Sequence, residues 1–265
     1  MTCVLQISDP HIVADGALVS GRLETAAPLE RLVMRLQDIL PRIGPVDALL
    51  ISGDVSDDGT PASYARFARI IAPLDLPTYV IPGNHDARDA MRDAFTDDGY
   101  LPATGRLNWH LPLGNVHLIG LDTLIEGAGG GTLDAATLAF LGNTLAALNG
   151  APVLLALHHP PFATGIHFMD AIGLDNADAL QDILRGYRGE VRVVCGHIHS
   201  MMTVALPPHI ALSSPAPCSH FAYDRRAAAP VGYHEHAGGC LLHRWDGRFS
   251  TVHIPADPGP GPFPF

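Results

Sequence analysis

Lysine is absent from this 265-residue chain, and all 16 of its basic residues are arginine. The absence of lysine excludes both the lysine of a P-loop and a Schiff-base lysine. Because 27 acidic residues outnumber the arginines, the formal net charge is −11. Nucleic-acid polymers are bound by clustered cations that neutralise phosphates, and the arginines here are scattered. We therefore expect a small-molecule partner and no nucleic-acid polymer.

Cysteines and long apolar runs are also scarce. The four cysteines show no C-x-x-C spacing, which argues against a zinc knuckle or a disulfide framework. No apolar run approaches the roughly 18 to 20 residues that a membrane-spanning helix needs. The N-terminus lacks the basic region and apolar core of a signal peptide, and no G-x-S-x-G nucleophile elbow occurs. We expect a soluble, cytoplasmic protein with no membrane partner.

The spacing of apolar residues predicts alternating strands and helices. Apolar residues recur at helical spacing over 27–43, and further helices are predicted near 61–72, 133–148 and 176–187. Strands are predicted for the apolar runs "CVLQIS", "DALLIS", "TYVI", "PVLLAL" and "VRVVC", and a hairpin for 105–122, with its turn at Gly114-Asn115. The opening β-α-β-α-β order predicts a largely parallel sheet with right-handed crossovers. The short strands expected after residue 200 are consistent with a second sheet.

The chain shows no internal repeat and no linker that would divide it. We therefore predict one domain over residues 1–254. The final stretch, "PADPGPGPFPF", is too rich in proline and glycine for regular structure, so residues 255–265 are expected to form an extended tail.

Fifteen histidines are the unusual feature of the composition, and several of them follow predicted strands. Open α/β sheets bind their ligands at the carboxyl ends of their strands. The polar residues at these ends are Asp9, His11, Asp54, Asn84, His85, His158, His197 and His199. Each cluster alone is compatible with turn chemistry or a solvent-facing pair, but five such clusters at five strand ends favour one site. Oxygen and imidazole donors without thiolate suit Mn, Fe, Zn or Co.

The ordered pattern D-P-H, G-D, G-N-H-D, an isolated H and G-H-x-H, over roughly residues 3 to 200, resembles the calcineurin-like metallophosphoesterases. The segments "GNHDAR", "HHP" and "CGHIHS" are similar to those of the bacterial class III cyclic nucleotide phosphodiesterases and related glycerophosphodiesterases. This resemblance implies an α/β fold, a four-layer α/β/β/α sandwich with two mixed sheets. It also implies two divalent metal ions.

The resemblance assigns roles to the matching positions. It implies a first metal bound by Asp9, His11 and His199, and a second metal bound by Asn84, His158 and His197. Asp54 would bridge the two metals, as suits an anionic, oxygen-rich ligand that reduces the repulsion between two cations. Asp54, Asn84 and His85 form the implied catalytic set, in which His85 acts on the leaving group or on developing charge. Asn84 and His85, together with His159, are the predicted substrate contacts, although His159 could equally serve packing.

The expected activity is the hydrolysis of phosphodiester bonds by a hydroxide that bridges the two metals. A cyclic nucleotide such as 3',5'-cyclic AMP is the preferred substrate, and a glycerophosphodiesterase or a broad-specificity phosphodiesterase is the alternative. A metal-bearing scaffold without turnover is the alternative from another class. Relatives of this kind are commonly oligomeric, so a homo-oligomer is expected.

Residues 160–178 are predicted to form a long loop, and such loops tend to be functional. Its apolar side chains could form a wall for an organic group or pack as core beneath the loop; they are Phe162, His167, Phe168 and Met169.

Other polar residues have two interpretations. Arg88 and Arg92 could contact phosphate or cap a helix. His234 and His236 flank Glu235 at strand spacing and could form an extra metal site, but no further acidic ligand is marked nearby. The sequence does not decide between these interpretations.

Overall fold

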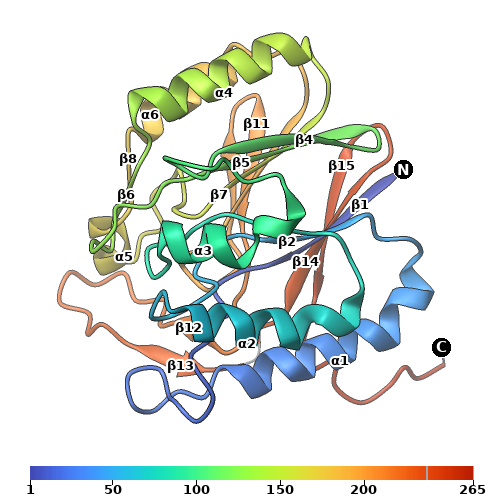
Figure 1. The fold of residues 1–265 in the computed structure, drawn as a ribbon, viewed down its shortest axis with the longest axis vertical. Coiled ribbons are helices and arrows are strands. Elements are labelled where there is room, and N and C mark those ends of the chain that lie inside the picture. The colour runs from blue at the N-terminus through green and yellow to red at the C-terminus, as the bar shows by residue number, and fades with distance from the viewer. Residues whose placement is uncertain (237, 265) are drawn as a thin grey trace.

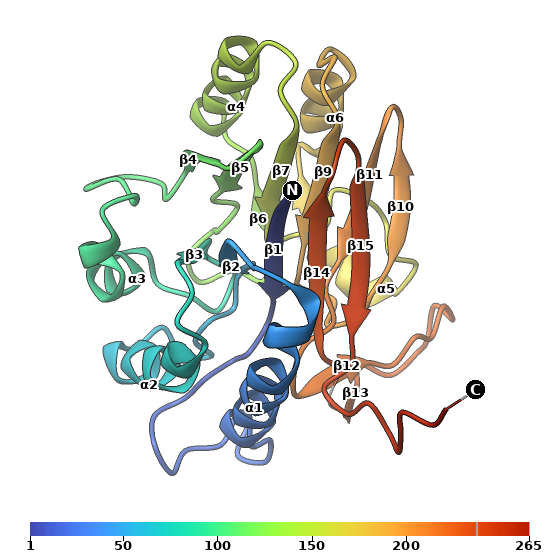
Figure 2. The ribbon, with the colours of Figure 1, turned by 90° about the vertical axis from the view of Figure 1, so that its right-hand side faces the viewer.

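The fold has four layers, as the predicted sandwich requires. The structure is a computed structural model that describes residues 1–236 and 238–264. One sheet is covered by α1 (Ala26–Ile43), α2 (Pro61–Ile71) and α3 (Arg88–Ala94), and the other by α4 (Ala135–Leu148) and α6 (Ala177–Arg185) (Figures 1 and 2). In the described part of the chain, no helix is both long and apolar enough to span a bilayer.

Both large sheets are mixed. The first has the order β15-β14-β1-β2-β3, with β1 (Thr2–Ile7), β2 (Ala48–Ile51), β3 (Thr78–Val80), β14 (Cys240–Trp245) and β15 (Phe249–Ile254). The second has the order β10-β11-β9-β7-β5-β4, with β4 (Trp109–Leu113), β5 (Val116–Leu121), β7 (Val153–Leu157), β9 (Val191–Cys195), β10 (Thr203–Leu206) and β11 (His209–Ser213). Strands β1, β2 and β3 run parallel, as do β5, β7, β9 and β11.

Successive side chains of the central strands face different layers, as the twofold period of a strand requires. In β1, Leu5 packs into the helix-covered core and Val4 into the core between the sheets. In β7, Leu155 packs toward the helices and Leu154 toward the opposite sheet. Because these strands are buried on both faces, they read in the sequence as continuous apolar runs.

Several smaller elements were not predicted. They are α3, α5 (His167–Ala171), the short 3-10 helices η1 (Ala72–Leu74) and η2 (Thr96–Asp98), and the two-stranded pairs of β6 (Gly131–Thr132) with β8 (Leu174–Asp175) and of β12 (Ser219–Phe221) with β13 (Tyr233–Glu235). The expectation of a structureless loop over 160–178 is therefore wrong, because that segment contains α5 and β8. After β15, residues 255–264 carry no helix or strand.

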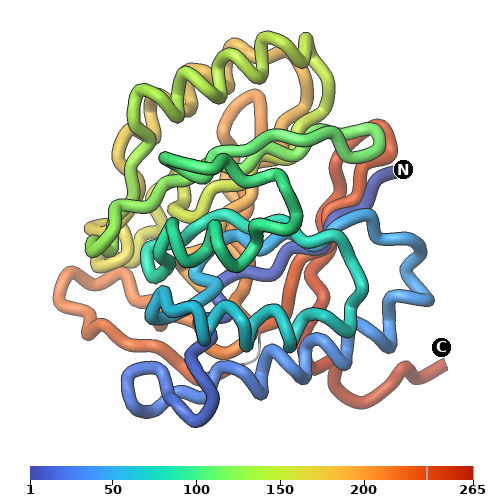
Figure 3. Tube along the Cα trace, viewed as in Figure 1, coloured from blue at the N-terminus to red at the C-terminus, as the bar shows by residue number. Residues whose placement is uncertain are grey.

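The short strands after residue 200 were consistent with a second sheet, but they are divided between the two large sheets. Strands β14 and β15 join the first sheet through antiparallel pairing of β14 with β1, so the first strand of the chain and its last two strands lie side by side (Figure 3). Strands β10 and β11 extend the second sheet from β9. Such pairings depend on contacts between residues far apart in the chain, and local periodicity does not encode them.

A buried polar network connects the two sheets. Gln6 of β1 donates through Nε2 to the Cys195 carbonyl of β9 at 3.0 Å, and its Oε1 lies 2.9 Å from His243 Nε2. The other nitrogen of His243 lies 2.9 Å from Thr251 Oγ1, which accepts from Arg192 of β9. Because the Gln6 oxygen can only accept, His243 Nε2 is the donor. Burial and the nearby charge of Arg192 oppose a second proton on Nδ1 by lowering the pKa of His243, so Nδ1 accepts from Thr251 and His243 is buried as the neutral imidazole.

This network predicts a pH-dependent contribution to stability. Burial lowers the pKa of His243 to about 3, against 6.5 for an exposed imidazole. Below pH 6.5 His243 binds a proton in the unfolded chain, whereas in the folded chain it stays unprotonated down to about pH 3. The free energy of unfolding therefore decreases as the pH falls through this window. At pH 5 the loss should be about 2 kcal/mol, at about 1.4 kcal/mol per pKa unit. Urea unfolding at pH 7 and pH 5 should therefore show a smaller decrease in the free energy of unfolding for His243→Gln than for wild type. Equal decreases would contradict the burial of His243 as the neutral imidazole.

Candidate metal centre

The candidate residues converge at one end of the two sheets. Asp9 and His11 follow β1, Asp54 follows β2, and Asn84 follows β3 in the first sheet. His158 and the 197–199 segment follow β7 and β9 in the second sheet. The carboxyl ends of these parallel strands point the same way, so side chains from both sheets meet above the core between them.

One group of donors consists of Asp9, His11 and His199, all buried. His11 Nε2 lies 3.1 Å from His199 Nε2, which lies 3.5 Å from Asp9 Oδ1. The other nitrogen of His11 lies 3.0 Å from Asp57 Oδ1 and donates to that carboxylate. The bond from Nδ1 to Asp57 leaves Nε2 as the nitrogen of His11 that faces the other two residues.

A second group surrounds His158, which is fully buried. Its Nδ1 donates to the Ser52 carbonyl at 2.9 Å, so Nε2 is the nitrogen that faces the site. Around this Nε2 lie Asn84 Oδ1 at 3.2 Å, Asp54 Oδ2 at 3.4 Å and Asp9 Oδ1 at 3.9 Å. One imidazole nitrogen and three side-chain oxygens therefore face one another.

Asp54 joins the two groups. Its Oδ2 lies 3.4 Å from His11 Nε2 and also 3.4 Å from His158 Nε2. Its other oxygen accepts the backbone N–H of His85 at 2.9 Å, which fixes the orientation of the carboxylate. One oxygen of Asp54 is thus shared by both clusters, which is the arrangement expected of a bridging ligand.

The donor set fits two divalent cations. Carboxylate, amide and imidazole side chains converge here from both sheets, and nitrogen and oxygen ligands of this kind suit first-row divalent metals. The local field also favours positive charge. Burial alone would lower the pKa of His158, but Asp54 outweighs it and raises the pKa to about 9. For the same reason, His158 and His11 overcome burial and hold the pKa of Asp54 well below its usual range.

His197 and His159 lie beside the second group. The His197 ring centroid is 5.2 Å from that of His158 and 4.6 Å from that of His159. The backbone N–H of His197 donates to Asp9 at 2.9 Å, and its Nε2 donates to the Ile172 carbonyl at 3.1 Å. That bond leaves Nδ1 as the nitrogen with a lone pair.

His159 is fully buried, and both of its nitrogens are bonded inside the protein. One lies 2.8 Å from Thr123 Oγ1 and the other 3.2 Å from the Gly129 carbonyl. Burial, with the neighbouring charge of His158, lowers the pKa of His159 to about 3. Its ring still lies close enough to His158 and His197 for the ligand atoms of the three histidines to fall within 4.8 Å of one another. The predicted contact of His159 with the substrate stays a prediction.

His85 lies at the open side of the centre, with 41% of its side chain exposed. Its Nδ1 lies 3.0 Å from the Asp57 carbonyl and 3.2 Å from Asp57 Oδ1. Asp57 thus contacts both His85 and the donor His11, a position that the sequence analysis missed. Three residues after Asp54, in "SGDVSDDG", its carboxylate looked like turn chemistry. The imidazoles of His11 and His85 lower the pKa of Asp57 far below its usual range despite partial burial.

The backbone of the site is strained. Nine non-glycine residues of the described chain have positive φ, and five of them are site residues: Asp9, His11, Asp54, His197 and His199. Such conformations cost of order 1 to 3 kcal/mol each and concentrate at functional sites. The glycines of the motifs have a related role. A Cβ at Gly83 would collide with Asp54, and one at Gly53, where φ is +99°, with His158.

Two arginines after "GNHD" are engaged in the fold. Arg88 Nε donates to Asp122 Oδ2 at 2.6 Å, and its NH2 group donates to Oδ1 at 2.9 Å. Arg92 donates to the carbonyls of Pro102 and Gly105. These contacts favour the structural interpretation over a phosphate contact.

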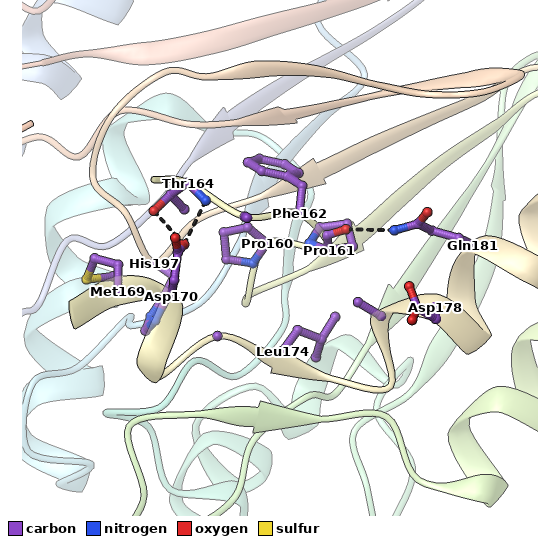
Figure 4. A pocket seen from close by; sticks show the side chains of 13 residues that line it. Pro160, Pro161, Phe162, Thr164, Met169, Asp170, Leu174, Asp178, Gln181 and His197 are labelled. Carbon is purple, nitrogen blue, oxygen red and sulfur yellow. Dashed lines mark hydrogen bonds between the residues drawn. The ribbon is translucent and has the colours of Figure 1, made fainter. Parts of the chain in front are cut away.

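The apolar side chains of 160–178 are also largely structural. Met169 is buried with Ile166 and Ile198, and Phe162 packs against the core beneath α4 and α6. A cavity of about 280 Å³ lies between this segment and α6, with His197 among its lining residues (Figure 4). Gln181 donates to the Pro161 carbonyl across one side of it, and Asp170 accepts from Thr164.

His234 and His236 lie outside the donor groups. Within the described residues, the clusters that could hold a metal ion do not include either of them. Both side chains are exposed, and both rings lie near that of His220, with centroids 5.2 and 5.4 Å away.

Comparison with known proteins finds relatives that match most of this chain. A sequence model of the family described as "Calcineurin-like phosphoesterase" matches residues 4–201. The 3',5'-cyclic adenosine monophosphate phosphodiesterase of Pseudomonas aeruginosa is 37% identical over 220 residues, covering 83% of this chain and 77% of that protein. A probable glycerophosphodiester phosphodiesterase of Arcobacter nitrofigilis is 30% identical over 265 residues, covering 99% and 96%.

Solved structures share the fold at low identity. A dimetal phosphatase from Danio rerio gives a TM-score of 0.64 at 14% identity, covering 97% of this chain and 96% of that one. The inner membrane complex anchor GAP50 of Plasmodium gives 0.66 at 12% identity, covering 98% and 86%. The four-layer sandwich predicted from the motifs is thereby confirmed.

Proposed function

Since the chain belongs to the calcineurin-like phosphoesterase family, we propose that it is a metal-dependent hydrolase of phosphodiester bonds. The observation that carries this proposal is the pair of donor groups joined by one oxygen of Asp54, beside the exposed imidazole of His85. The relatives named as cyclic nucleotide and glycerophosphodiester phosphodiesterases support the choice of diesters.

The residues divide into ligands and groups that act on the substrate. Asp9, His11 and His199 would hold one divalent ion, and Asn84, His158 and His197 the other, with Asp54 between them. When bound, such a pair of ions lowers the pKa of water and offsets charge on the phosphate. His85 is exposed and fixed by Asp57, so it can donate to the leaving oxygen. Asn84 and His85 are the groups proposed to contact the phosphate.

We propose 3',5'-cyclic AMP or a related cyclic nucleotide as the substrate. The Pseudomonas relative, at 37% identity, supports this choice. A glycerophosphodiester is the second candidate, because the relative named for that activity is matched over 99% of this chain. The catalytic domain is proposed to be residues 1–254, with 255–265 as a tail. A homo-oligomer, a cytoplasmic location and the lack of nucleic-acid or membrane partners stay predictions.

A substrate panel tests the proposed class of reaction. We expect bis(p-nitrophenyl) phosphate to be hydrolysed with a higher kcat/KM than p-nitrophenyl phosphate, and cyclic AMP to be turned over under the same metal conditions. The panel should be run with Mn, Fe, Zn and Co in turn, alongside metal analysis of the purified protein. A preference for the monoester would contradict the diester assignment, and diester turnover without cyclic AMP turnover would favour the glycerophosphodiesterase.

A further inference from the structure

The β12–β13 hairpin presents two different faces. Its register places Ser219 opposite Glu235, His220 opposite His234 and Phe221 opposite Tyr233. Residues directly opposite one another project to the same side, and the side alternates along each strand. One face therefore carries the pair Ser219 and Glu235 and, next to it, the pair Phe221 and Tyr233, and the other face carries His220 and His234.

The face with the aromatic residues begins at the candidate metal centre. Ser219 Oγ lies 3.1 Å from His199 Nδ1, and the Phe221 ring centroid lies 4.8 Å from that of His199. Phe168 of α5 packs edge-on against Phe221, with centroids 5.1 Å apart. Phe221 is therefore held in place between a metal-donor residue and an aromatic support.

Beyond Phe221 lies a cavity of about 590 Å³. Its walls include Phe221, Tyr233 and Glu235 of this face, together with His234 of β13 and Val231 and Gly232 just before that strand. The relative exposure of Val231 is 68% and that of Tyr233 is 38%, so apolar surface is available to a ligand. Arg22, from the loop after β1, donates through Nε to Glu235 at 3.3 Å and completes the rim. Cavities of roughly 300 to 1,000 Å³ are typical of small-molecule sites.

We propose that this aromatic face binds the purine base of a cyclic nucleotide whose phosphate lies at the metal centre. The proposal rests on the proposed function and names the part of the protein that selects its substrate. Every base has a π-face that stacks on an aromatic ring, and Phe221 offers such a ring next to His199. The Glu235 carboxylate at the rim can accept a hydrogen bond from an exocyclic amino group. In a cyclic nucleotide one ribose separates the base from the phosphate. A phosphate at the metal centre therefore places the base within a short distance of it, next to Phe221 and His199.

The smaller cavity near α6 is a poorer base site. Its volume of about 280 Å³ is below the roughly 300 to 1,000 Å³ typical of small-molecule sites (Figure 4). Its one aromatic lining residue, Phe162, packs against the helix-covered core. At its end, His197 directs Nε2 to the Ile172 carbonyl.

Phe221→Leu tests the proposal, because it keeps apolar bulk but removes the ring. Stacking on an aromatic side chain contributes roughly 1 to 3 kcal/mol per base, or about 5- to 150-fold in affinity. We expect kcat/KM for cyclic AMP to fall about tenfold or more, mainly through KM. For glycerophosphoethanolamine, which has no ring, the change should stay within about twofold. The affinity of the metal-loaded protein for adenosine, measured by equilibrium dialysis, should decrease by a similar factor to kcat/KM for cyclic AMP.

Three further variants separate stacking from damage to the fold. Phe221→Tyr should keep cyclic AMP turnover and adenosine binding, because it keeps a ring. Tyr233→Leu, at a residue that does not contact His199, should weaken both in the same direction. Tyr223→Leu is the matched control, since Tyr223 is an aromatic residue with 64% exposure that does not line the cavity; it should change neither.

The outcomes distinguish this proposal from the proposed function. An equal loss for cyclic AMP and glycerophosphoethanolamine in Phe221→Leu would mean that Phe221 only supports His199, and it would overturn the base site. Unchanged cyclic AMP turnover and adenosine binding would overturn it too. If wild type hydrolyses no diester but binds adenosine through Phe221, the base site stands and the proposed function fails.

Discussion

Asp54→Asn should abolish activity and lower the metal content from two ions per chain toward one or none. The carboxylate oxygen Oδ2 lies 3.4 Å from the Nε2 atoms of both His11 and His158, so it is close to both donor groups. Asparagine removes the negative charge between two cations and can turn an NH₂ group toward two imidazole lone pairs. Because a metal ion contributes several kcal/mol to transition-state stabilisation, the fall in kcat/KM should be about 10³-fold or more.

The loop should survive this change, since the asparagine oxygen can still accept the backbone N–H of His85. Asp58→Asn is the matched control, because the Asp58 carboxylate accepts from Ser56, Thr60 and Ser63 and contacts neither donor group. Metal analysis and diester kinetics on both variants decide the matter. Full occupancy with near-normal turnover in Asp54→Asn would make the bridging assignment wrong.

The sequence could predict the position of the site because its chemistry is local to strand ends. An apolar run followed by Asp9, Asp54 or His158 signals both a buried strand and the polar group at its carboxyl end. Parallel pairing then brings those ends together. The structure adds a physical reason for the glycines of these motifs, because a Cβ at Gly53 or Gly83 would collide with His158 or Asp54.

Directions of side chains were harder to predict. His197 and His199 would share a face if they lay on a strand, but β9 ends at Cys195 and both residues have positive φ. Their rings accordingly meet different neighbours, His158 for the first and His11 for the second. Local spacing alone does not reveal such a turn.

Residues that act through long-range contacts were missed. Asp57 contacts His11 and His85, which lie 46 and 28 residues away along the chain. Phe221 reaches His199 only because β12 folds back across the site. In the sequence, a carboxylate in "SDDG" and a phenylalanine near the C-terminus carry no signal of these contacts.

Asp57→Asn can be compared with a substitution of His85, because Asp57 contacts both the proposed metal ligand His11 and the proposed catalytic residue His85. Asparagine can still hydrogen-bond, but without the negative charge it orients the imidazoles of His11 and His85 less firmly. We therefore expect weaker metal binding as well as lower turnover. A variant that affects turnover alone would have to act at His85 itself.

His85→Ala should keep both metals and lower kcat for diesters by roughly 10²-fold or more, the scale of acid–base and charge-stabilising groups. Burial alone would lower the pKa of His85, but its bond to Asp57 and the charge of Asp54 raise it to about 10. Because Asp57 holds Nδ1, the exposed ring can donate from Nε2 to the leaving oxygen. The loss should therefore be smaller for p-nitrophenyl diesters, whose leaving group needs less protonation, than for cyclic AMP. Metal analysis with kinetics on both substrates checks this, and loss of a metal from His85→Ala would instead make His85 a ligand.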